Sequence, residues 1–80
     1  MQWIAHKFGG SSVANAARYQ AVARLLAGRD DPAQIVVVSA MQGVTDALIG
    51  LTRKAAAGDV AWRLDLANLR QRHIDAATEL

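Results

Sequence analysis

The chain has 80 residues, about half the length of an ordinary domain, so we expect no more than one folding unit. Lys and Arg number 9 and Asp and Glu number 7, for a formal net charge of +2. The basic residues are scattered, with no run and no interleaved aromatics, so a nucleic-acid partner has little support. Cysteine is absent, which excludes a disulfide scaffold, a thiolate zinc site and a cysteine nucleophile.

Apolar residues make up 52% of the chain, which is too many for a disordered protein. Much of this fraction is alanine, so the core should be small and the chain only marginally stable by itself. No stretch reaches the ~20 apolar residues of a membrane span, and the N-terminus lacks the pattern of a secretory signal. We therefore predict a cytoplasmic protein with no membrane partner.

The first half of the chain has the pattern of a strand, a helix and a second strand. Residues 2–8 predict a short strand, which Gly9-Gly10-Ser11-Ser12 ends. Apolar residues recur at three and four over 13–26, which predicts a helix with one buried stripe. Ser11 or Ser12 is a suitable N-cap for this helix, and Gly28 is a suitable stop.

The second half begins with Ile35-Val36-Val37-Val38, a run of β-branched residues. Such a run predicts a strand covered on both faces, as in parallel sheets. A loop over 40–43 follows, then a helix over 45–57 closed by Gly58, and a third helix over 61–80. The order of elements predicts an α/β protein whose first three elements form a parallel βαβ unit.

Both predicted strands end in small-residue loops, and these loops should meet at the carboxyl edge of the sheet, where α/β proteins bind ligands. In the first loop, Gly9 and Gly10 would let an anion approach the backbone N–H groups, and Lys7 would add a full positive charge. The loop is not a Walker A motif, because in that motif the lysine follows the glycines. An ordinary strand-to-helix turn is the alternative interpretation.

Two segments resemble a known family. Lys7-Phe8-Gly9-Gly10-Ser11-Ser12-Val13 is similar to the opening Lys-Phe-Gly-Gly-Thr/Ser-Ser-Val signature of aspartokinases, which are members of the amino acid kinase family. Val37-Val38-Ser39-Ala40-Met41-Gln42-Gly43-Val44-Thr45-Asp46 resembles that family's Val-Val-Ser-Ala-Met-x-Gly-Val-Thr-Asp/Asn stretch. The two matches occur in the expected order and at about the expected separation, and the resemblance covers essentially the whole chain.

The resemblance implies an N-terminal βαβ unit plus further helices of the parallel-sheet amino acid kinase fold. Residues 1–80 would be an incomplete N-terminal part of the kinase domain, with no second domain. The implied activity is transfer of the ATP γ-phosphoryl group to the β-carboxylate of L-aspartate, the first step in lysine, threonine and methionine biosynthesis. Some members are fused to homoserine dehydrogenase, a fusion that these 80 residues cannot reveal. The full-length parent is expected to be a homo-oligomer.

The resemblance also assigns roles to individual residues. It implies that Lys7 is catalytic and that the ATP phosphates are bound by Lys7, Phe8, Gly9, Gly10 and Ser11. It assigns the aspartate substrate to Ser39 and Thr45. It implies no protein ligand for a metal, with Mg²⁺ held mainly through the ATP phosphates. The isolated chain is expected to be inactive, because family members carry the nucleotide-base pocket and further acids downstream.

Several alternatives stay open at this point. Thr45 has the sequence context of an ordinary helix N-cap, and Ser39 of a strand end. We interpret His73, on the apolar stripe of the third helix, as a packed structural histidine. A non-catalytic phosphate-binding or self-associating fragment is the alternative to a kinase segment. A second alternative is another amino acid kinase family member acting on a different carboxylate, a carbamate or a nucleotide.

Overall fold

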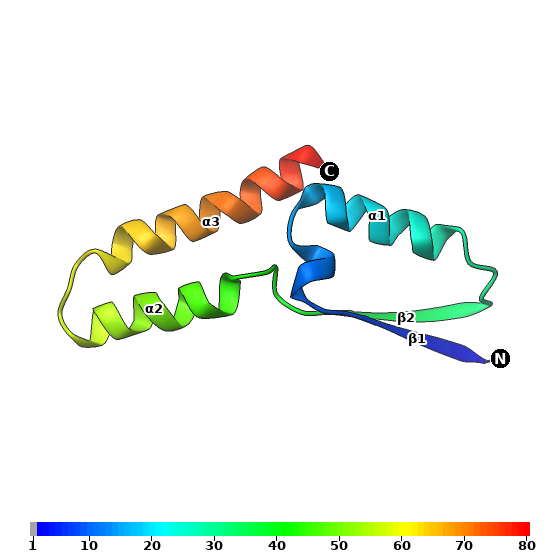
Figure 1. The fold of residues 1–80 in the computed structure, drawn as a ribbon, viewed down its shortest axis with the longest axis horizontal. Coiled ribbons are helices and arrows are strands. Elements are labelled where there is room, and N and C mark those ends of the chain that lie inside the picture. The colour runs from blue at the N-terminus through cyan, green and yellow to red at the C-terminus, as the bar shows by residue number, and fades with distance from the viewer. Residues whose placement is uncertain (1) are drawn as a thin grey trace. The chain divides into compact units, whose positions relative to one another are not determined.

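The computed structural model describes residues 2–80. Its elements in chain order are β1 (Trp3–Phe8), the 3₁₀ turn η1 (Gly10–Val13), α1 (Ala16–Ala27), β2 (Ala33–Val38), α2 (Val44–Ala56) and α3 (Trp62–Glu79) (Figure 1). The chain divides into two compact units. The first ends at Gln42 and the second runs from Gly43 to Leu80.

The first unit is built on a two-stranded parallel sheet, as predicted. β1 and β2 pair in register from Trp3 opposite Ala33 to Phe8 opposite Val38, and α1 is the crossover between them (Figure 1). The Ser39 N–H donates to the Phe8 carbonyl at 3.0 Å and so extends the pairing beyond β2. Both strands therefore end at the same edge of the sheet, with their loops side by side.

The helix α1 packs on one face of β1. Side chains alternate between faces along a strand, and Ile4, His6 and Phe8 are half-buried whereas Lys7 and Ala5 are exposed. Phe8 lines a cavity of about 250 Å³ together with α1 residues Ala21, Val22 and Leu25. Lys7 consequently lies on the face of β1 that α1 does not cover.

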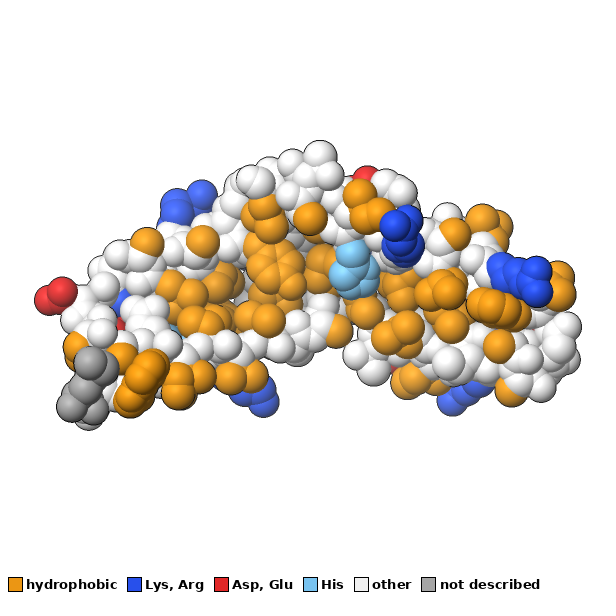
Figure 2. Space-filling view, turned by 180° about the vertical axis from the view of Figure 1, so that it is seen from behind, with side chains coloured by type: hydrophobic (Ala, Val, Ile, Leu, Met, Phe, Trp, Pro, Cys, Tyr) orange, Lys and Arg blue, Asp and Glu red, His pale blue; other side chains and the backbone are white. Residues whose placement is uncertain are grey.

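The strand β2 is much more exposed than its sequence predicts. The four residues from Ile35 to Val38 are each 44–50% exposed, so the expectation that both faces are covered is wrong for this unit. The reason is that α1 is the one α-helix of the first unit in the described part of the chain, so this unit leaves β2 largely uncovered. Figure 2 shows the hydrophobic side chains that are visible from one side of the molecule.

The first helix begins later than predicted. Residues 10–13 form η1, in which the Ser12 N–H donates to the Gly9 carbonyl at 3.0 Å and Val13 is completely buried. The N-cap of α1 is Asn15, whose side-chain oxygen accepts the Arg18 N–H at 3.0 Å. Burial of Val13 favours the tighter turn, so neither serine caps α1. The stop at Gly28 is confirmed: its N–H donates to the Arg24 carbonyl at 3.0 Å.

The second unit is a pair of antiparallel helices, α2 and α3 (Figure 1). The predicted closure at Gly58 is confirmed, since this residue has a φ of +76°. Its N–H donates to the Ala55 carbonyl at 3.1 Å, and the Asp59 N–H donates to the Lys54 carbonyl at 2.9 Å. These two bonds form the Schellman motif, in which glycine is favoured. No helix within residues 2–80 is long and apolar enough to cross a bilayer.

The partly buried face of α3 does not include His73, which the sequence predicts to lie on the apolar stripe of this helix. Its partly buried positions recur at three and four, and they are Trp62, Asp65, Leu69, Arg72 and Ala76. His73 is exposed, and its Nδ1 lies 2.8 Å from the Leu69 carbonyl in the preceding turn. The interpretation of His73 as a packed histidine is therefore wrong. Asp65 is drawn to this face by an ion pair of 2.6 Å with Lys54 of α2.

Candidate functional site

Lys7 stands one residue before the end of β1, on the uncovered face of the sheet. Its side chain is exposed, and within residues 2–80 its ammonium forms no hydrogen bond or ion pair. Lys7 pairs with Val37, and every residue of β1 is in register with one of β2. Lys7 thus presents a positive charge from a paired position of the sheet, and its ammonium has no competing partner in the described chain.

The two glycines that follow serve different purposes. An added Cβ at Gly10 would lie 3.3 Å from the Gln42 Cα and 3.4 Å from the Ala40 carbonyl oxygen, closer than ordinary contact. The absence of a side chain at Gly10 therefore gives room for the close approach of the two loops. A Cβ at Gly9 would meet nothing within 4 Å. The space at Gly9, two residues from Lys7, is open to an anion.

Ser11 is the second residue of η1 and is exposed. The first N–H groups of a helical turn have no acceptor inside the turn, so the amides of Gly10 and Ser11 are the candidate anion donors. The prediction that a long helix begins at this loop is wrong, because α1 starts at Ala16. Any anion site here therefore depends on Lys7 and these amides and not on the α1 dipole.

The second loop brings Ser39 to the same edge. The backbone N–H of Ser39 bonds the Phe8 carbonyl, and its hydroxyl donates to the Ala40 carbonyl at 2.9 Å. Met41, two residues further, is buried and anchors the loop. The structure thus brings Lys7, Phe8, Gly9, Gly10, Ser11 and Ser39 together at the carboxyl edge of the sheet.

Thr45 belongs to the second unit, where it is the second residue of α2. The N-cap of this helix is Gly43, with a φ of +85°, and no side chain caps it. The Thr45 hydroxyl forms no hydrogen bond within the described residues, and the side chain is exposed. The alternative interpretation of Thr45 as an ordinary N-cap is therefore wrong, and its hydroxyl is available to a ligand.

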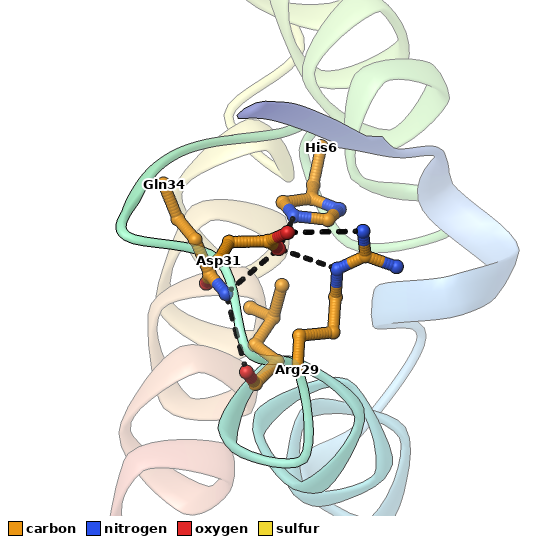
Figure 3. A network of polar contacts seen from close by, with 5 residues as sticks. His6, Arg29, Asp31 and Gln34 are labelled. Atoms are coloured by element: carbon orange, nitrogen blue, oxygen red, sulfur yellow. Dashed lines mark hydrogen bonds and ion pairs between the residues drawn. The ribbon is translucent and has the colours of Figure 1, made fainter. Parts of the chain in front are cut away.

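A polar cluster that the sequence did not reveal lies on the α1-covered face of β1. Asp31 contacts His6, Arg29 and Gln34 (Figure 3). The hydrogen bond from Arg29 is the main cause that holds the pKa of the Asp31 carboxyl below its usual range, and it raises the pKa of Arg29. The segment around Asp31 reads only as a polar turn, and the contact to His6 spans 25 residues. A histidine on a half-covered strand was the one available signal.

Comparison with known families decides the relationship of this chain to other proteins. The model of the amino acid kinase family matches residues 2–79. The chain belongs to the amino acid kinase family. As a member of that family, it has the predicted α/β class, with the parallel β1–α1–β2 unit at its start. The match includes both loops at the carboxyl edge of the sheet.

The relatives of this amino acid kinase segment include aspartokinases from plants. It is 36% identical over 78 residues to the chloroplastic bifunctional aspartokinase/homoserine dehydrogenase 2 of Zea mays, covering 98% of this chain and 8% of the maize protein. It is 39% identical over 77 residues to the chloroplastic aspartokinase 3 of Arabidopsis thaliana, covering 92% of this chain and 14% of that protein. The chain thus spans a small fraction of these relatives. No solved structure gives a significant match.

Proposed function

We propose that this segment supplies the phosphate-binding edge of an ATP-dependent kinase that phosphorylates the β-carboxylate of L-aspartate. Membership of the amino acid kinase family and the similarity to proteins named aspartokinase support this proposal. The observation that carries it is the exposed, unpartnered ammonium of Lys7 two residues from the open space at Gly9. A cytoplasmic setting stays a prediction.

The arrangement suits phosphoryl transfer, which requires positioning and charge stabilisation more than covalent chemistry. ATP would supply the phosphoryl group, which passes to a carboxylate oxygen as the bond to ADP breaks. Lys7 would offset the negative charge on the oxygens of that group. The amides of Gly10 and Ser11 would donate to the same oxygens from a fixed loop, because Gly10 is held against Gln42.

Phe8 would act by positioning the phosphate loop and not by contacting the phosphates with its side chain. Its side chain lines the cavity against α1, and its carbonyl accepts the Ser39 N–H. Both contacts fix the point at which the phosphate loop leaves the sheet. We therefore expect Phe8 to place the loop and Lys7, Gly9, Gly10 and Ser11 to face the phosphates.

The described residues do not form a metal-binding cluster of their own. Within residues 2–80, no group of three or more His, Cys, Asp or Glu side chains could hold one. Mg²⁺ would accordingly be held mainly through the phosphates of ATP, whose oxygens are the hard ligands that this ion prefers. Its role would be to offset charge alongside Lys7.

Ser39 and Thr45 are the proposed contacts for aspartate. The Thr45 hydroxyl is free, and Thr45 lies in the first turn of α2, where the helix dipole favours a carboxylate. The Ser39 hydroxyl donates to Ala40 and would have to rotate to donate to a substrate. Both side chains are hydrogen-bond donors of the kind that bind carboxylates.

A segment exchange tests the proposal. The matching 78 residues of the maize bifunctional relative would be replaced by this chain, and ATP-dependent phosphorylation of aspartate would be measured. We expect an active enzyme in which Lys7→Ala lowers kcat/KM by about 100-fold or more, as for loss of a charge-stabilising donor. Lys54→Ala is the matched control, since Lys54 is the other lysine of the chain and pairs with Asp65.

The homoserine dehydrogenase activity of the same protein reports whether the exchanged enzyme is intact. Full kinase activity in the Lys7→Ala variant would contradict the role of Lys7. Loss of kinase activity on exchange, with the dehydrogenase activity unchanged and the protein soluble, would contradict the proposed function itself. If Lys54→Ala loses as much kinase activity as Lys7→Ala, removal of either lysine lowers the activity, and the effect is not specific to Lys7.

The exposure of β2 favours a second candidate, a self-associating fragment without catalysis. Ile35 to Val38 are 44–50% exposed and uncharged, and an open strand edge of this kind pairs readily with other chains. Sedimentation of the 80-residue chain over a range of concentrations separates the two. A monomer at all concentrations would contradict self-association, whereas reversible oligomers that bind no ATP would favour it over the kinase segment.

A further inference from the structure

The carboxylate of Asp31 is the centre of the polar cluster in the first unit (Figure 3). Its Oδ2 accepts Arg29 Nε at 2.5 Å and Gln34 Nε2 at 3.2 Å, and Oδ1 accepts Arg29 Nη2 at 3.2 Å. His6 Nε2 lies 3.3 Å from Oδ2. The side chains of His6 and Asp31 are each only 13% exposed. An ionised carboxylate only accepts hydrogen bonds, which places a proton on His6 Nε2.

This cluster connects the two strands of the first unit with the helix α1. His6 comes from the middle of β1, and Gln34 comes from the second position of β2. Gln34 Nε2 also donates to the carbonyl of Leu26, in the last turn of α1, at 3.3 Å. Arg29 follows α1 directly. The Asp31 carboxylate therefore links β1 to β2, and Gln34 links the cluster to α1.

The cluster matters because little else holds β1 in place. Among the described residues of the first unit, the buried apolar side chains are Val13, Ala16 and Met41, and none of them lies in β1. Trp3 at the start of β1 is 59% exposed. A strand with so weak a core is prone to slip, and a slip of one residue moves each side chain to the opposite face.

His6 and Lys7 are neighbours on β1, so their side chains lie on opposite faces of the sheet. Fixing His6 on the face that α1 covers therefore fixes Lys7 on the uncovered face. Asp31, from the connection after α1, contacts His6, and Arg29 and Gln34 contact Asp31 in turn. The register of the ladder, with Lys7 opposite Val37, and the contact between His6 and Asp31 therefore place the lysine on the same face.

We infer that Asp31 is a positioning residue for Lys7: it anchors His6 to the α1 side of β1 and thereby holds the Lys7 ammonium at the anion-accessible side of the sheet. This inference extends the proposed function, and it rests on that proposal for the identity of the ligand as ATP. The placement of Lys7 itself does not depend on ATP. The two can therefore be tested separately.

The first test measures the placement of Lys7 in the 80-residue chain without nucleotide. Lys7 is opposite Val37 in the sheet register, so we expect nuclear Overhauser contacts between these side chains in the unchanged protein. Asp31→Asn keeps the shape of the side chain and removes its charge, and His6→Phe keeps bulk on the covered face. Both variants should lose most of these contacts. Asp30→Asn is the matched control and should keep them.

Two outcomes of this measurement would overturn the inference. If both variants keep the contacts between Lys7 and Val37, the cluster does not set the face of the lysine. If both variants lose the dispersed amide signals of β1 and β2 altogether, the cluster is a general stability element and not a positioning device. A variant that keeps the sheet signals but loses the contacts supports it.

The second test is a double-mutant cycle on ATP affinity, with Asp31→Asn, Lys7→Ala and both together. If Asp31 acts through Lys7, Asp31→Asn should weaken ATP binding by about threefold to tenfold alone and have no effect once Lys7 is alanine. Equal effects in both backgrounds would contradict the inference. An unchanged chain that binds no ATP would contradict the proposed function, while the Overhauser measurement still decides the placement of Lys7.

Discussion

Gly10 and Gln42 lie in backbone contact, and a Cβ on Gly10 would come within 3.3 Å of the Gln42 Cα. This contact joins the loop after β1 to the loop after β2, so the two loops at the sheet edge form one structural feature. Backbone atoms cannot rotate away as a side-chain tip can. A Cβ at this position would therefore press on the backbone of the second loop, whatever ligand the first loop binds.

Gly10→Ala should destabilise the first unit by about 1–3 kcal/mol, as is typical when an atom is forced into a packed site. Gly9→Ala is the control, because its Cβ would meet nothing within 4 Å and its φ of −80° suits alanine. Urea unfolding, followed by the amide signals of β1 and β2, measures both. Equal destabilisation by the two substitutions would show that the loop contact is not the cause.

Asn15→Ala should destabilise α1 by about 0.5–2 kcal/mol, because the Asn15 side chain accepts the Arg18 N–H. Ser11→Ala should leave α1 unaffected, because Ser11 lies in η1 and caps nothing. Hydrogen exchange of the first-turn amides of α1 measures this directly. Faster exchange in Ser11→Ala than in Asn15→Ala would restore the serine as the cap.

The start of α1 shows where local sequence signals are insufficient. Ser11, Ser12 and Asn15 are all good N-cap residues, and the residue pattern alone does not choose among them. The choice depends on the burial of Val13, which stabilises η1 and is a tertiary effect. The meeting of the two loops, in contrast, was predictable, because a parallel βαβ unit places both strand ends at one edge.

The cluster at Asp31 could not be predicted, for the same physical reason. Its contact to His6 joins residues 25 apart, and nothing in the local sequence specifies it. The exposure of β2 was also missed, because its β-branched run predicts a covered strand while the first unit provides a single helix for the sheet. Of the candidate site, Lys7 lies near the end of β1, and the glycines and Ser39 lie in the loops after β1 and β2, as their place in the sequence predicts.

The ion pair at Asp31 predicts a dependence of stability on acid. The pKa of Asp31 is lowered in the folded state, chiefly by the Arg29 hydrogen bond, so its stabilisation is present above the unfolded value of about 3.9. It is lost as the pH falls through the folded pKa. The unchanged chain should therefore have a higher free energy of unfolding than Asp31→Asn at pH 6. This difference should disappear as the pH is lowered to 2. A difference that persists at the lowest pH would contradict this assignment.

The ion pair between Lys54 and Asp65 links α2 to α3 at 2.6 Å. The hydrogen bond from Lys54 to Asp65 raises the pKa of Lys54, so its stabilisation is present below the unfolded value of about 10.4 and is lost as the pH rises through the folded pKa. Both side chains are partly exposed, so the effect should be small and salt-sensitive.

Lys54→Gln should accordingly lower the thermal stability of the second unit slightly at pH 7 and low salt, and not at high pH. Arg53→Gln is the matched control, since it removes a neighbouring charge of α2 without touching the pair. Differential scanning calorimetry at low and high salt separates the two variants. An identical loss in both would indicate a general charge effect and not this ion pair.

Thr45→Val separates a substrate contact from a structural role. Gly43 is the N-cap of α2, so removing the Thr45 hydroxyl should leave the helix intact and mainly raise the KM for aspartate in the segment-exchanged kinase. Gly43→Ala should do the opposite: a φ of +85° disfavours alanine by about 1–2 kcal/mol, and the second unit should lose stability. Unfolding curves and steady-state kinetics on both variants give the comparison. If Thr45→Val destabilises α2 as much as Gly43→Ala and leaves the KM unchanged, Thr45 is structural, and the assignment of this hydroxyl to the substrate is wrong.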